Sequence, residues 1–436
     1  MRRLIPFCFL AFTVLSQTQL FAQNDGKYLV TFRPGTSQTD RAAAVGRAGG
    51  AVRFNYSIVD AVAIRLPNAN AIAALQNNPA VVSIIRDRTV RAVPSSDVGT
   101  NGKPGGGGGG GGGGSAEVVP EGVKRVGIPT ATSNGANIGV AIMDTGIDLT
   151  NADLAPPADS FSAHGASCQD DNGHGTHVAG IIAALKGNNL GTIGVAPAAT
   201  LYCVKVLDAA GNGSDSDVLA GLEWVFNHSA IRVVNMSLGR DGTVHDNPLL
   251  RAAVQALYGA GVTVVVSAGN DATKEVSQMV PASYPEVVAV ASTTAIAGSN
   301  ACRWLSGVIA ADTASFFTTD GKGLGWDGTT GPWLGGVTIS APGEDSESVS
   351  RGCLISSTGI LSTKLGGGTT RMSGTSMASP HVAGIVARMV QGGLTGTEAI
   401  RHALRNTAQA GGSAPLNSPT TIYTDDTDRE GVAKAP

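Results

Sequence analysis

The sequence is poor in charge and has no long apolar stretch. Charged side chains make up 14% of its 436 residues, and the formal net charge at pH 7 is -3. A chain this close to neutrality lacks the basic surface that nucleic acids and anionic membranes attract, so we expect no nucleic-acid partner. No segment reaches the roughly 18 apolar residues that a membrane-spanning helix needs, and we expect no membrane anchor.

The chain does have the material for a large hydrophobic core. Hydrophobic residues make up 42% of it, a share typical of globular proteins. Its length exceeds that of one ordinary domain and fits two or three folded units.

The first residues have the pattern of an export signal. Arg2 and Arg3 supply a positive start, residues 4–15 a short apolar core, and residues 20–22 a plausible cleavage end. We therefore interpret residues 1–22 as a signal peptide and expect a secreted, extracellular product.

Cysteine is scarce, with five in the chain, and Cys8 is lost with the signal. Four cysteines in an oxidising compartment favour two disulfides, although buried free thiols are an alternative and several pairings are possible. Their order along the chain favours Cys168 with Cys203 and Cys302 with Cys353.

Residues 24–93 have the pattern of a small independent α+β domain. Alternating apolar residues and Gly/Pro turns predict strands, and the Ala-rich stretches that follow capping residues predict helices. The resulting β-α-β-β-α-β order is the ferredoxin-like arrangement. The expected strands are residues 28–32, 52–56, 61–66 and 81–85, and the expected helices are residues 37–48 and 70–76.

Residues 94–118 form a glycine-rich linker. It contains an unbroken run of glycines from Gly105 to Gly114. Such a run behaves as flexible coil and is accessible to proteases, which suits a precursor that is cleaved between two folded parts.

From residue 119 to 415, Val/Ile-rich runs alternate with helical segments. Such runs indicate parallel strands buried on both faces, and we expect a three-layer, doubly wound α/β sheet. In these sheets the chemistry lies at the carboxyl ends of the strands. The expected strands are residues 137–143, 201–207, 233–236, 262–266 and 287–291, and the expected helices are residues 175–185, 216–226 and 249–258.

Three distant segments each hold one member of a nucleophilic triad. Asp144 ends an apolar strand, where its carboxylate can accept an imidazole N–H. His174 lies between two glycines at the start of a helix, and Ser376 follows Gly374 at the start of another. A serine becomes a strong nucleophile when a histidine accepts its proton and a carboxylate orients that histidine.

Each of these residues also has a plainer interpretation. Asp144 alone could be a turn residue, and His174 with His177 could be a metal pair. Zinc normally needs a third protein ligand, and the sequence has no HExxH pattern. We therefore expect His177 to be a packed or hydrogen-bonded structural residue.

Asn270 ends the apolar segment 264–270. Its side-chain amide can join the backbone N–H of Ser376 as a donor to the oxyanion of the reaction. An asparagine in a simple turn is the alternative interpretation of this residue.

The order Asp144, His174, Ser376 is that of subtilisin and not that of chymotrypsin or the α/β hydrolases. The segments DTGID, GHGTHVAG, GVAP, SAGN and GTSMASPHVAG, in this order, resemble motifs of the subtilase family of serine proteases, peptidase family S8. Residues 27–93 resemble, more loosely, the inhibitory propeptide of this family. The resemblance implies a monomeric serine endopeptidase that acts on proteins or peptides through an acyl-enzyme. It also implies an autoprocessed zymogen that is restrained by its own propeptide.

The resemblance implies substrate-binding positions as well. An extended substrate would add as a strand between two segments of the protein and would be held by backbone hydrogen bonds. Small residues without buried charge would line the primary pocket, so we expect a preference for apolar or aromatic side chains. The implied positions are Ser237, Leu238 and Gly239 on one edge, Gly211 and Gly213 on the other, and Ala268, Gly269 and Ser283 at the pocket.

By the same resemblance, Asp153 and Asn188 would be ligands of a structural calcium ion, with Glu117 nearby. Hard oxygen donors in loops suit calcium. The loop of residues 186–192 is one residue longer than the family pattern, which leaves Asn188 and Asn189 as alternatives. Ordinary polar loop residues are a further alternative, and no cofactor is expected for catalysis.

Two segments depart from a minimal subtilase. Residues 299–340, which include Trp304, are expected to form a surface hairpin or to extend the substrate rim. Residues 416–436 are expected to be a surface or disordered tail. The alternative to an enzyme is an exported, non-catalytic binding protein with the subtilase fold, which a substituted triad would favour and an intact one does not.

Overall fold

The computed structural model describes residues 26–93, 117–128, 131–321, 335–417, 419–420 and 429–436. The chain forms two compact units, Met1–Asp87 and Arg88–Pro436. The predicted signal peptide and nearly all of the predicted linker lie outside the described residues. The expected boundary of the N-terminal domain at residue 93 differs from this division, since residues 88–93 belong to the larger unit.

The N-terminal unit has the element order expected from the sequence. Its antiparallel sheet has the strand order β2-β3-β1-β4. Ser37 and Asn68 cap its two helices, because their side chains accept hydrogen bonds from the N–H groups of Asp40 and Ala71. The elements are β1 (Lys27–Phe32), α1 (Gln38–Arg47), β2 (Ala51–Asn55), β3 (Ala61–Arg65), α2 (Ala69–Gln76) and β4 (Val81–Arg86).

The larger unit is built on a sheet of seven parallel strands in the order β16-β14-β12-β10-β6-β8-β7. Every residue of β6, β12 and β14 is buried, which explains their nearly continuous apolar sequence. The strands are β6 (Gly139–Asp144), β7 (Ser160–Ser162), β8 (Thr200–Lys205), β10 (Ile231–Met236), β12 (Thr263–Ser267), β14 (Val288–Thr294) and β16 (Ile339–Glu344).

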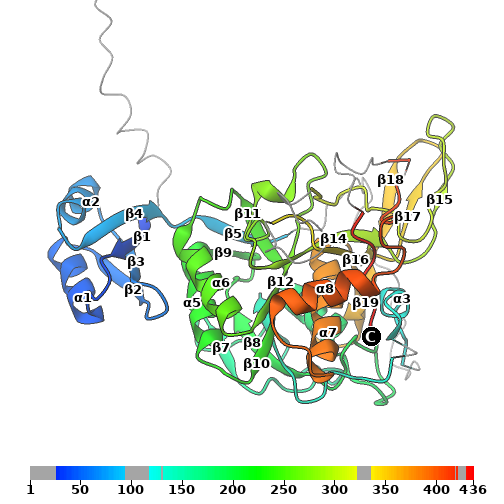
Figure 1. Ribbon diagram of the computed structural model, residues 1–436, viewed down its shortest axis with the longest axis horizontal. Helices are drawn as coiled ribbons and strands as arrows, with labels where there is room; N and C mark the ends of the chain where they lie inside the picture. Colours follow the sequence, from blue (N-terminus) through cyan, green and yellow to red (C-terminus); the bar gives the residue numbers. More distant parts are fainter. Residues whose placement is uncertain (1–25, 94–116, 129–130, 322–334, 418, 421–428) are drawn as a thin grey trace, which may run out of the picture. The chain divides into compact units, whose positions relative to one another are not determined.

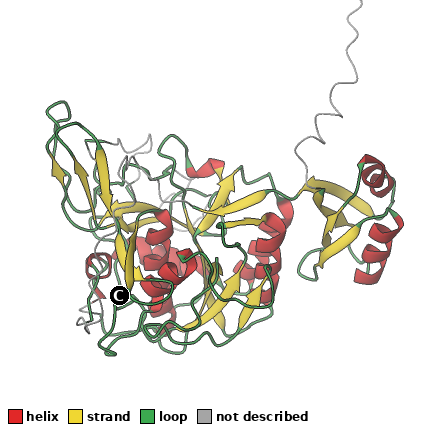
Figure 2. Ribbon diagram, turned by 180° about the vertical axis from the view of Figure 1, so that it is seen from behind, coloured by secondary structure: helices red, strands yellow, loops and turns green. Residues whose placement is uncertain are grey.

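Helices cover both faces of this sheet, which confirms the predicted three-layer fold (Figure 2). Along β6, Val140 and Ile142 belong to one core cluster with the apolar residues of α4 (His174–Ala183) and α7 (Thr375–Gln391). The Cε of Met143, whose side chain points to the opposite face, lies near Gly221 of α5. On that face α5 (Asp215–Phe226) and α6 (Pro248–Gly259) lie side by side (Figure 1).

Smaller elements surround the sheet. β5 (Thr89–Ala92), β9 (Asn212–Ser214), β11 (Leu238–Asp241) and β13 (Met279–Val280) form a second sheet. The remaining elements are α3 (Glu121–Arg125), the 3-10 helix η2 (Val276–Gln278), β15 (Ser299–Asn300), β17 (Ser346–Val349), β18 (Ile355–Thr358), β19 (Ile360–Thr363), β20 (Thr369–Met372) and α8 (Thr397–Thr407).

Two disulfides join the cysteines in the pairing that the sequence favoured, Cys168 with Cys203 and Cys302 with Cys353. The second disulfide holds the segment that departs from a minimal subtilase. Trp304 of that segment is 74% exposed, but β15 pairs parallel with β17, and the antiparallel pair of β17 with β18 lies after residue 340, so the described residues of 299–340 do not form the expected hairpin by themselves. Two further tryptophans of residues 299–340, Trp326 and Trp333, lie outside the described residues.

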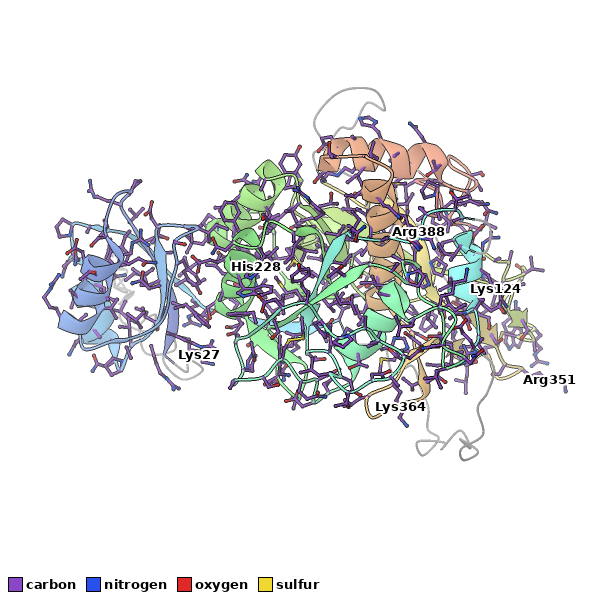
Figure 3. The ribbon with its side chains drawn as sticks, turned by 90° about the horizontal axis from the view of Figure 1, so that it is seen from below. Lys27, Lys124, His228, Arg351, Lys364 and Arg388 are labelled. Carbon is purple, nitrogen blue, oxygen red and sulfur yellow. A yellow bond between two sulfur atoms is a disulfide. The ribbon has the colours of Figure 1, made fainter. Side chains whose placement is uncertain are left out.

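A buried arginine fixes α7 to its surroundings. Arg388 lies on this helix (Figure 3), and its guanidinium donates to the backbone carbonyls of Val195 and Ser133. Burial lowers the pKa of Arg388 to about 10, so the side chain remains charged at neutral pH. These bonds tie the helix to the segment that follows α4 and to the segment that precedes β6.

The expectation of a surface or disordered tail is wrong for its last part. Val432 and Ala433 are each 1% exposed. The backbone of Ser340 in β16 donates to the carbonyl of Gly431 and accepts from the N–H of Ala433. Residues 431–433 therefore cover the edge of the main sheet, because they supply the hydrogen bonds that an edge strand otherwise lacks.

Among the described residues, no helix combines the length and the apolar character needed to cross a membrane.

Candidate active site

The predicted catalytic residues lie at the carboxyl ends of the central parallel strands. Asp144 is the last residue of β6, and Asn270 follows β12. His174 opens α4, and Ser376 lies in the first turn of α7. This is the edge at which a doubly wound sheet concentrates its chemistry.

Asp144 and His174 form a hydrogen-bonded pair, with 2.8 Å between Oδ1 and Nδ1. The N–H of Thr145 donates to the same carboxylate oxygen at 2.7 Å and fixes its orientation. The chain can approach this closely because residue 175 is glycine: a Cβ there would lie 2.1 Å from the carbonyl oxygen of Gly146.

The surroundings of His174 favour its charged form. Burial alone lowers its pKa, but the charge and hydrogen bond of Asp144, with the charge of Asp170, outweigh burial and raise the pKa above 6.5. A histidine with this environment accepts a proton readily, and Asp144 stabilises the resulting imidazolium.

Ser376 is buried, and its hydroxyl faces two backbone carbonyls. Oγ lies 3.1 Å from the oxygen of Val93 and 3.3 Å from that of Ser237. Among the described residues, Nε2 of His174 is buried and has no hydrogen-bond partner. The structure thus pairs Asp144 with His174, while the hydroxyl of Ser376 is turned to the carbonyl of Val93.

Asn270 lies directly beside the loop before Ser376. Its Oδ1 accepts hydrogen bonds from the N–H and the hydroxyl of Thr375, at 2.9 and 2.8 Å. This arrangement fixes which end of the amide carries the donors. A Cβ on Gly374 would lie 2.9 Å from Nδ2 of Asn270, so the glycine leaves room for that N–H₂ group.

The side chain of Ser237 is a site feature that the sequence analysis missed. Its Oγ lies 2.9 Å from the carbonyl oxygen of Ser376 and 2.9 Å from Oγ of Ser379. Nδ2 of Asn235 donates to the same hydroxyl at 2.9 Å. Pro380 could have indicated this role of Ser237 from the sequence. Proline has no N–H, so a proline inside the helix leaves the carbonyl of Ser376 without its usual helical partner.

The segment Arg88–Val93 occupies the position that was predicted for an extended substrate. Its strand β5 lies between β9 and β11 (Figure 1). It pairs antiparallel with both, with Ala92 opposite Leu238, Arg91 opposite Gly239 and Val90 opposite Gly213. The N–H groups of Ala92 and Val93 donate to the carbonyls of Gly211 and Ser237, at 2.9 and 3.4 Å.

The residues implied for the primary pocket gather around Met279. A Cβ on Gly269 would lie 3.1 Å from Cε of Met279, and the N–H of Ser283 donates to the carbonyl of Met279 at 2.7 Å. Ala268 is fully buried just before Gly269. That these residues form a specificity pocket remains a prediction.

His177 is a buried structural residue, as predicted. Its Nε2 lies 3.0 Å from the carbonyl oxygen of Ile360. Burial, with the neighbouring His174, lowers its pKa to about 3, so it is neutral. Within the described part of the chain, no cluster of three or more His, Cys, Asp or Glu residues is arranged to hold a metal ion.

The residues suggested for calcium do come together. Nδ2 of Asn188 lies 2.8 Å from Oδ1 of Asp153, and the N–H of Thr192 donates to its other oxygen at 2.9 Å. Glu117 accepts hydrogen bonds from the N–H groups of Gly187 and Asn188, at 2.6 and 3.3 Å. Of the two alternatives left by the loop length, Asn188 is the one that contacts Asp153.

Comparisons with known proteins agree with this geometry. The sequence pattern of the subtilase family matches residues 135–428. Subtilisin E of Bacillus subtilis (strain 168) is 30% identical over 398 residues, which cover 89% of this chain and 86% of that protein. Subtilisin Savinase of Lederbergia lenta is 37% identical over 306 residues, which cover 69% of this chain and 95% of that protein. An alkaline protease of Shouchella clausii is also 37% identical over 306 residues, which cover 69% of this chain and 67% of that protein.

Proposed function

The chain belongs to the subtilase family and is a serine endopeptidase, and we propose that it is an exported zymogen whose triad is Asp144, His174 and Ser376. The observation that carries the proposal is the position of Val93. Its carbonyl oxygen lies against the hydroxyl of Ser376, at the end of a strand held like a bound substrate.

In the proposed reaction, Oγ of Ser376 attacks the carbonyl carbon of the substrate while its proton passes to Nε2 of His174. This step requires the hydroxyl to turn from the backbone carbonyls toward the unpartnered Nε2. Asp144 keeps the proton on Nδ1 and stabilises the imidazolium. Nδ2 of Asn270 and the N–H of Ser376 stabilise the oxyanion.

The intermediate then collapses. The C–N bond breaks, the leaving amine takes the proton from His174, and an ester between Ser376 and the substrate acyl group remains. Water attacks this ester with His174 again as the base, which releases the acid product and restores the hydroxyl of Ser376.

The position of residues 88–93 supports a self-restrained precursor. While this strand lies between β9 and β11, a substrate cannot add there, so the segment acts as an inhibitor in its own cleft. The first bond presented to Ser376 is the one between Val93 and Pro94. We propose that maturation cuts this bond or one in the linker that follows, and that residues 24–93 act as the propeptide.

We also propose a structural calcium ion held by oxygens of Asp153, Asn188 and Glu117, which requires the amide of Asn188 to turn, because its Nδ2 donates to Asp153 in this structure. Burial raises the pKa of Asp153, and the neighbouring Glu117 carboxylate adds to this against the hydrogen bonds from Thr192 and Asn188. A bound cation would remove this penalty, and such oxygen donors suit calcium. The site would act on stability and would take no part in the proposed chemistry.

Two features support the remaining parts of the proposal. The two disulfides suit an oxidising compartment, in agreement with an export signal at residues 1–22.

The small residues Ala268, Gly269 and Ser283, together with the apolar Val93 next to the nucleophile, support a preference for apolar or aromatic substrate residues. We expect the mature enzyme to be a monomer.

A fluorophosphonate probe tests the proposal directly. The chain, expressed in full and allowed to mature, should incorporate one label at Ser376, whereas the Ser376→Ala variant should take up none. This variant should fold but keep the full precursor mass after removal of the signal. A folded, processed protein that neither reacts with the probe nor cleaves casein would overturn the proposed function.

A further inference from the structure

The strand in the cleft reaches beyond the positions that the triad and the pocket define. When substrate residues are numbered backward from the cleaved bond, Val93 is P1, and the register of β5 makes Arg91 P3 and Arg88 P6. Arg88 directly precedes β5 and is the first residue of the larger unit.

Arg88 is held by its backbone and by its side chain. The N–H of Asp215 donates to the carbonyl oxygen of Arg88 at 2.9 Å. Its guanidinium donates to Oδ2 of Asp246 with 2.5 Å between the two atoms. The backbone bond is available to any residue, but the ion pair distinguishes a basic residue from others.

Asp246 lies in the loop between β11 and α6, and the loop fixes its carboxylate. The hydroxyl of Thr243 donates to Oδ1 at 3.1 Å, and Arg240 lies 3.6 Å from Oδ2. A Cβ on residue 242 would lie 2.5 Å from Oδ2 of Asp246, so Gly242 makes room for the carboxylate. Partial burial raises the pKa of Asp246, but Thr243 and Arg88 outweigh it and lower the pKa, so the group is ionised at neutral pH.

The nearby Arg240 is shared between Asp246 and a second carboxylate, that of Asp215. Its guanidinium is engaged by the buried Asp215, with Nε to Oδ1 at 2.9 Å and a second nitrogen to Oδ2 at 2.8 Å. The cluster of one arginine and two aspartates thus carries one net negative charge, which lies at the position of the sixth substrate residue.

We infer that Asp246 is a specificity-determining residue that favours substrates with arginine or lysine at P6. This inference rests on the proposed function, because it assumes that substrates follow the path of residues 88–93. The side chains of Arg88 and Asp246 are 51% and 27% exposed, so solvent weakens their attraction. We expect an effect of roughly two- to fivefold in kcat/KM.

The test uses matched peptides and the enzyme obtained by expressing the full chain and letting it mature. Quenched fluorescent peptides carry the sequence of residues 89–93 before the cleaved bond and arginine, alanine or glutamate at P6. The enzyme should cleave the arginine peptide roughly two- to fivefold faster, in kcat/KM, than the alanine peptide and should cleave the glutamate peptide slowest. Added salt should reduce these ratios.

Variants separate this contact from a general charge effect. Asp246→Asn should bring the ratio of arginine to alanine peptide to about one, and Asp246→Lys should reverse the order of arginine and glutamate. Asp159→Asn removes the same charge far from the strand, at a residue paired with His228, and should leave the ratios unchanged. The alanine peptide reports for each variant whether the enzyme is folded and active.

The outcomes are distinct. If no peptide is cleaved by any preparation, the proposed function fails. If all three are cleaved equally by the unaltered enzyme, or if the arginine preference persists in Asp246→Asn, the function stands and the inference about Asp246 is overturned.

Discussion

The hydroxyl of Ser237 donates a hydrogen bond to the backbone carbonyl of Ser376, with 2.9 Å between the oxygens. In a regular helix this carbonyl would accept the N–H of residue 380, but residue 380 is proline. A side chain from the residue that follows β10 therefore completes the first turn of the helix that carries the proposed nucleophile.

This relationship predicts a coupled effect of two substitutions. Ser237→Ala leaves a buried carbonyl without a partner and should lower the free energy of unfolding by about 1–3 kcal/mol. Pro380→Ala restores an N–H to the helix and should reduce the cost of Ser237→Ala in the double variant. Thermal or urea unfolding of the two single variants and the double variant, all in the inactive Ser376→Ala background, measures this coupling. Purely additive changes in the free energy of unfolding would contradict the prediction.

The Asp144–His174 pair predicts the acid limb of the pH profile. His174 must be neutral to accept the proton of Ser376, so kcat/KM should fall as the pH drops through its pKa. Because that pKa is raised, the midpoint should lie above 6.5. A profile measured with a neutral peptide substrate checks this, and a midpoint below that value would speak against the assigned base.

Asp144→Asn should remove the main cause that raises the pKa of His174. The variant should lose about 10⁴-fold in kcat, because the amide no longer holds the required tautomer. Its remaining activity should show an acid limb shifted to lower pH. Unchanged folding, checked by circular dichroism, would assign the loss to chemistry, whereas a loss of less than tenfold would contradict the role of Asp144.

The buried carboxyl group of Glu344 should make the free energy of unfolding depend on pH. Burial, with the charges of Glu347 and Asp345, outweighs the hydrogen bonds from Ser357 and Ser315 and raises its pKa to about 7 from 4.5. Because the folded protein holds this proton more tightly than the unfolded chain does, protonation of Glu344 stabilises the fold. The stabilisation is complete at a pH below the pKa of the unfolded chain, and it is lost as the pH rises through the pKa of the folded protein. The total is about 3 kcal/mol by linkage.

We therefore expect Glu344→Gln to stabilise the Ser376→Ala protein at about pH 8 relative to about pH 5, as melting curves would show. Glu121→Gln is the matched control, because Glu121 forms an exposed pair with Lys124 and should change stability little. Equal effects of Glu344→Gln at the two pH values would contradict the prediction.

Calcium should stabilise the mature enzyme through Asp153. An ion at about 100 times its dissociation constant adds about 2.7 kcal/mol to the free energy of unfolding. The melting temperature should rise with added calcium and fall with a chelator, and Asp153→Asn should reduce this response strongly. The response of Asp148→Asn, a buried aspartate earlier in the same loop between β6 and β7, serves for comparison, and a calcium response that survives Asp153→Asn would place the ion elsewhere.

Much of the site could be predicted because its signals are local. Apolar strands that end at Asp144 and Asn270, and glycines around His174, mark backbone positions that a parallel sheet brings to one edge. Order along the chain favoured the disulfide pairing that the structure has, although it left other pairings open. The β-α-β-β-α-β order of the first unit followed from its turns and caps.

What escaped prediction depends on contacts between distant segments. The sequence of residues 88–93 does not predict that they pair with β9 and β11, because the register between distant strands has no local signal. The side-chain role of Ser237 depends on Pro380, far along the chain. The tail was expected to be a surface or disordered segment, yet Val432 and Ala433 are buried and residues 431 and 433 are bonded to Ser340 of β16.

That tail has a consequence for how the protein behaves when it is cut. The backbone of Ser340 is paired with residues 431 and 433, and Glu430 accepts a hydrogen bond from the Ser340 hydroxyl. A single cleavage in the stretch before residue 429 followed by loss of this short peptide would bare the edge of β16. We expect the damaged molecules to self-associate through that edge, which a rise in turbidity would reveal.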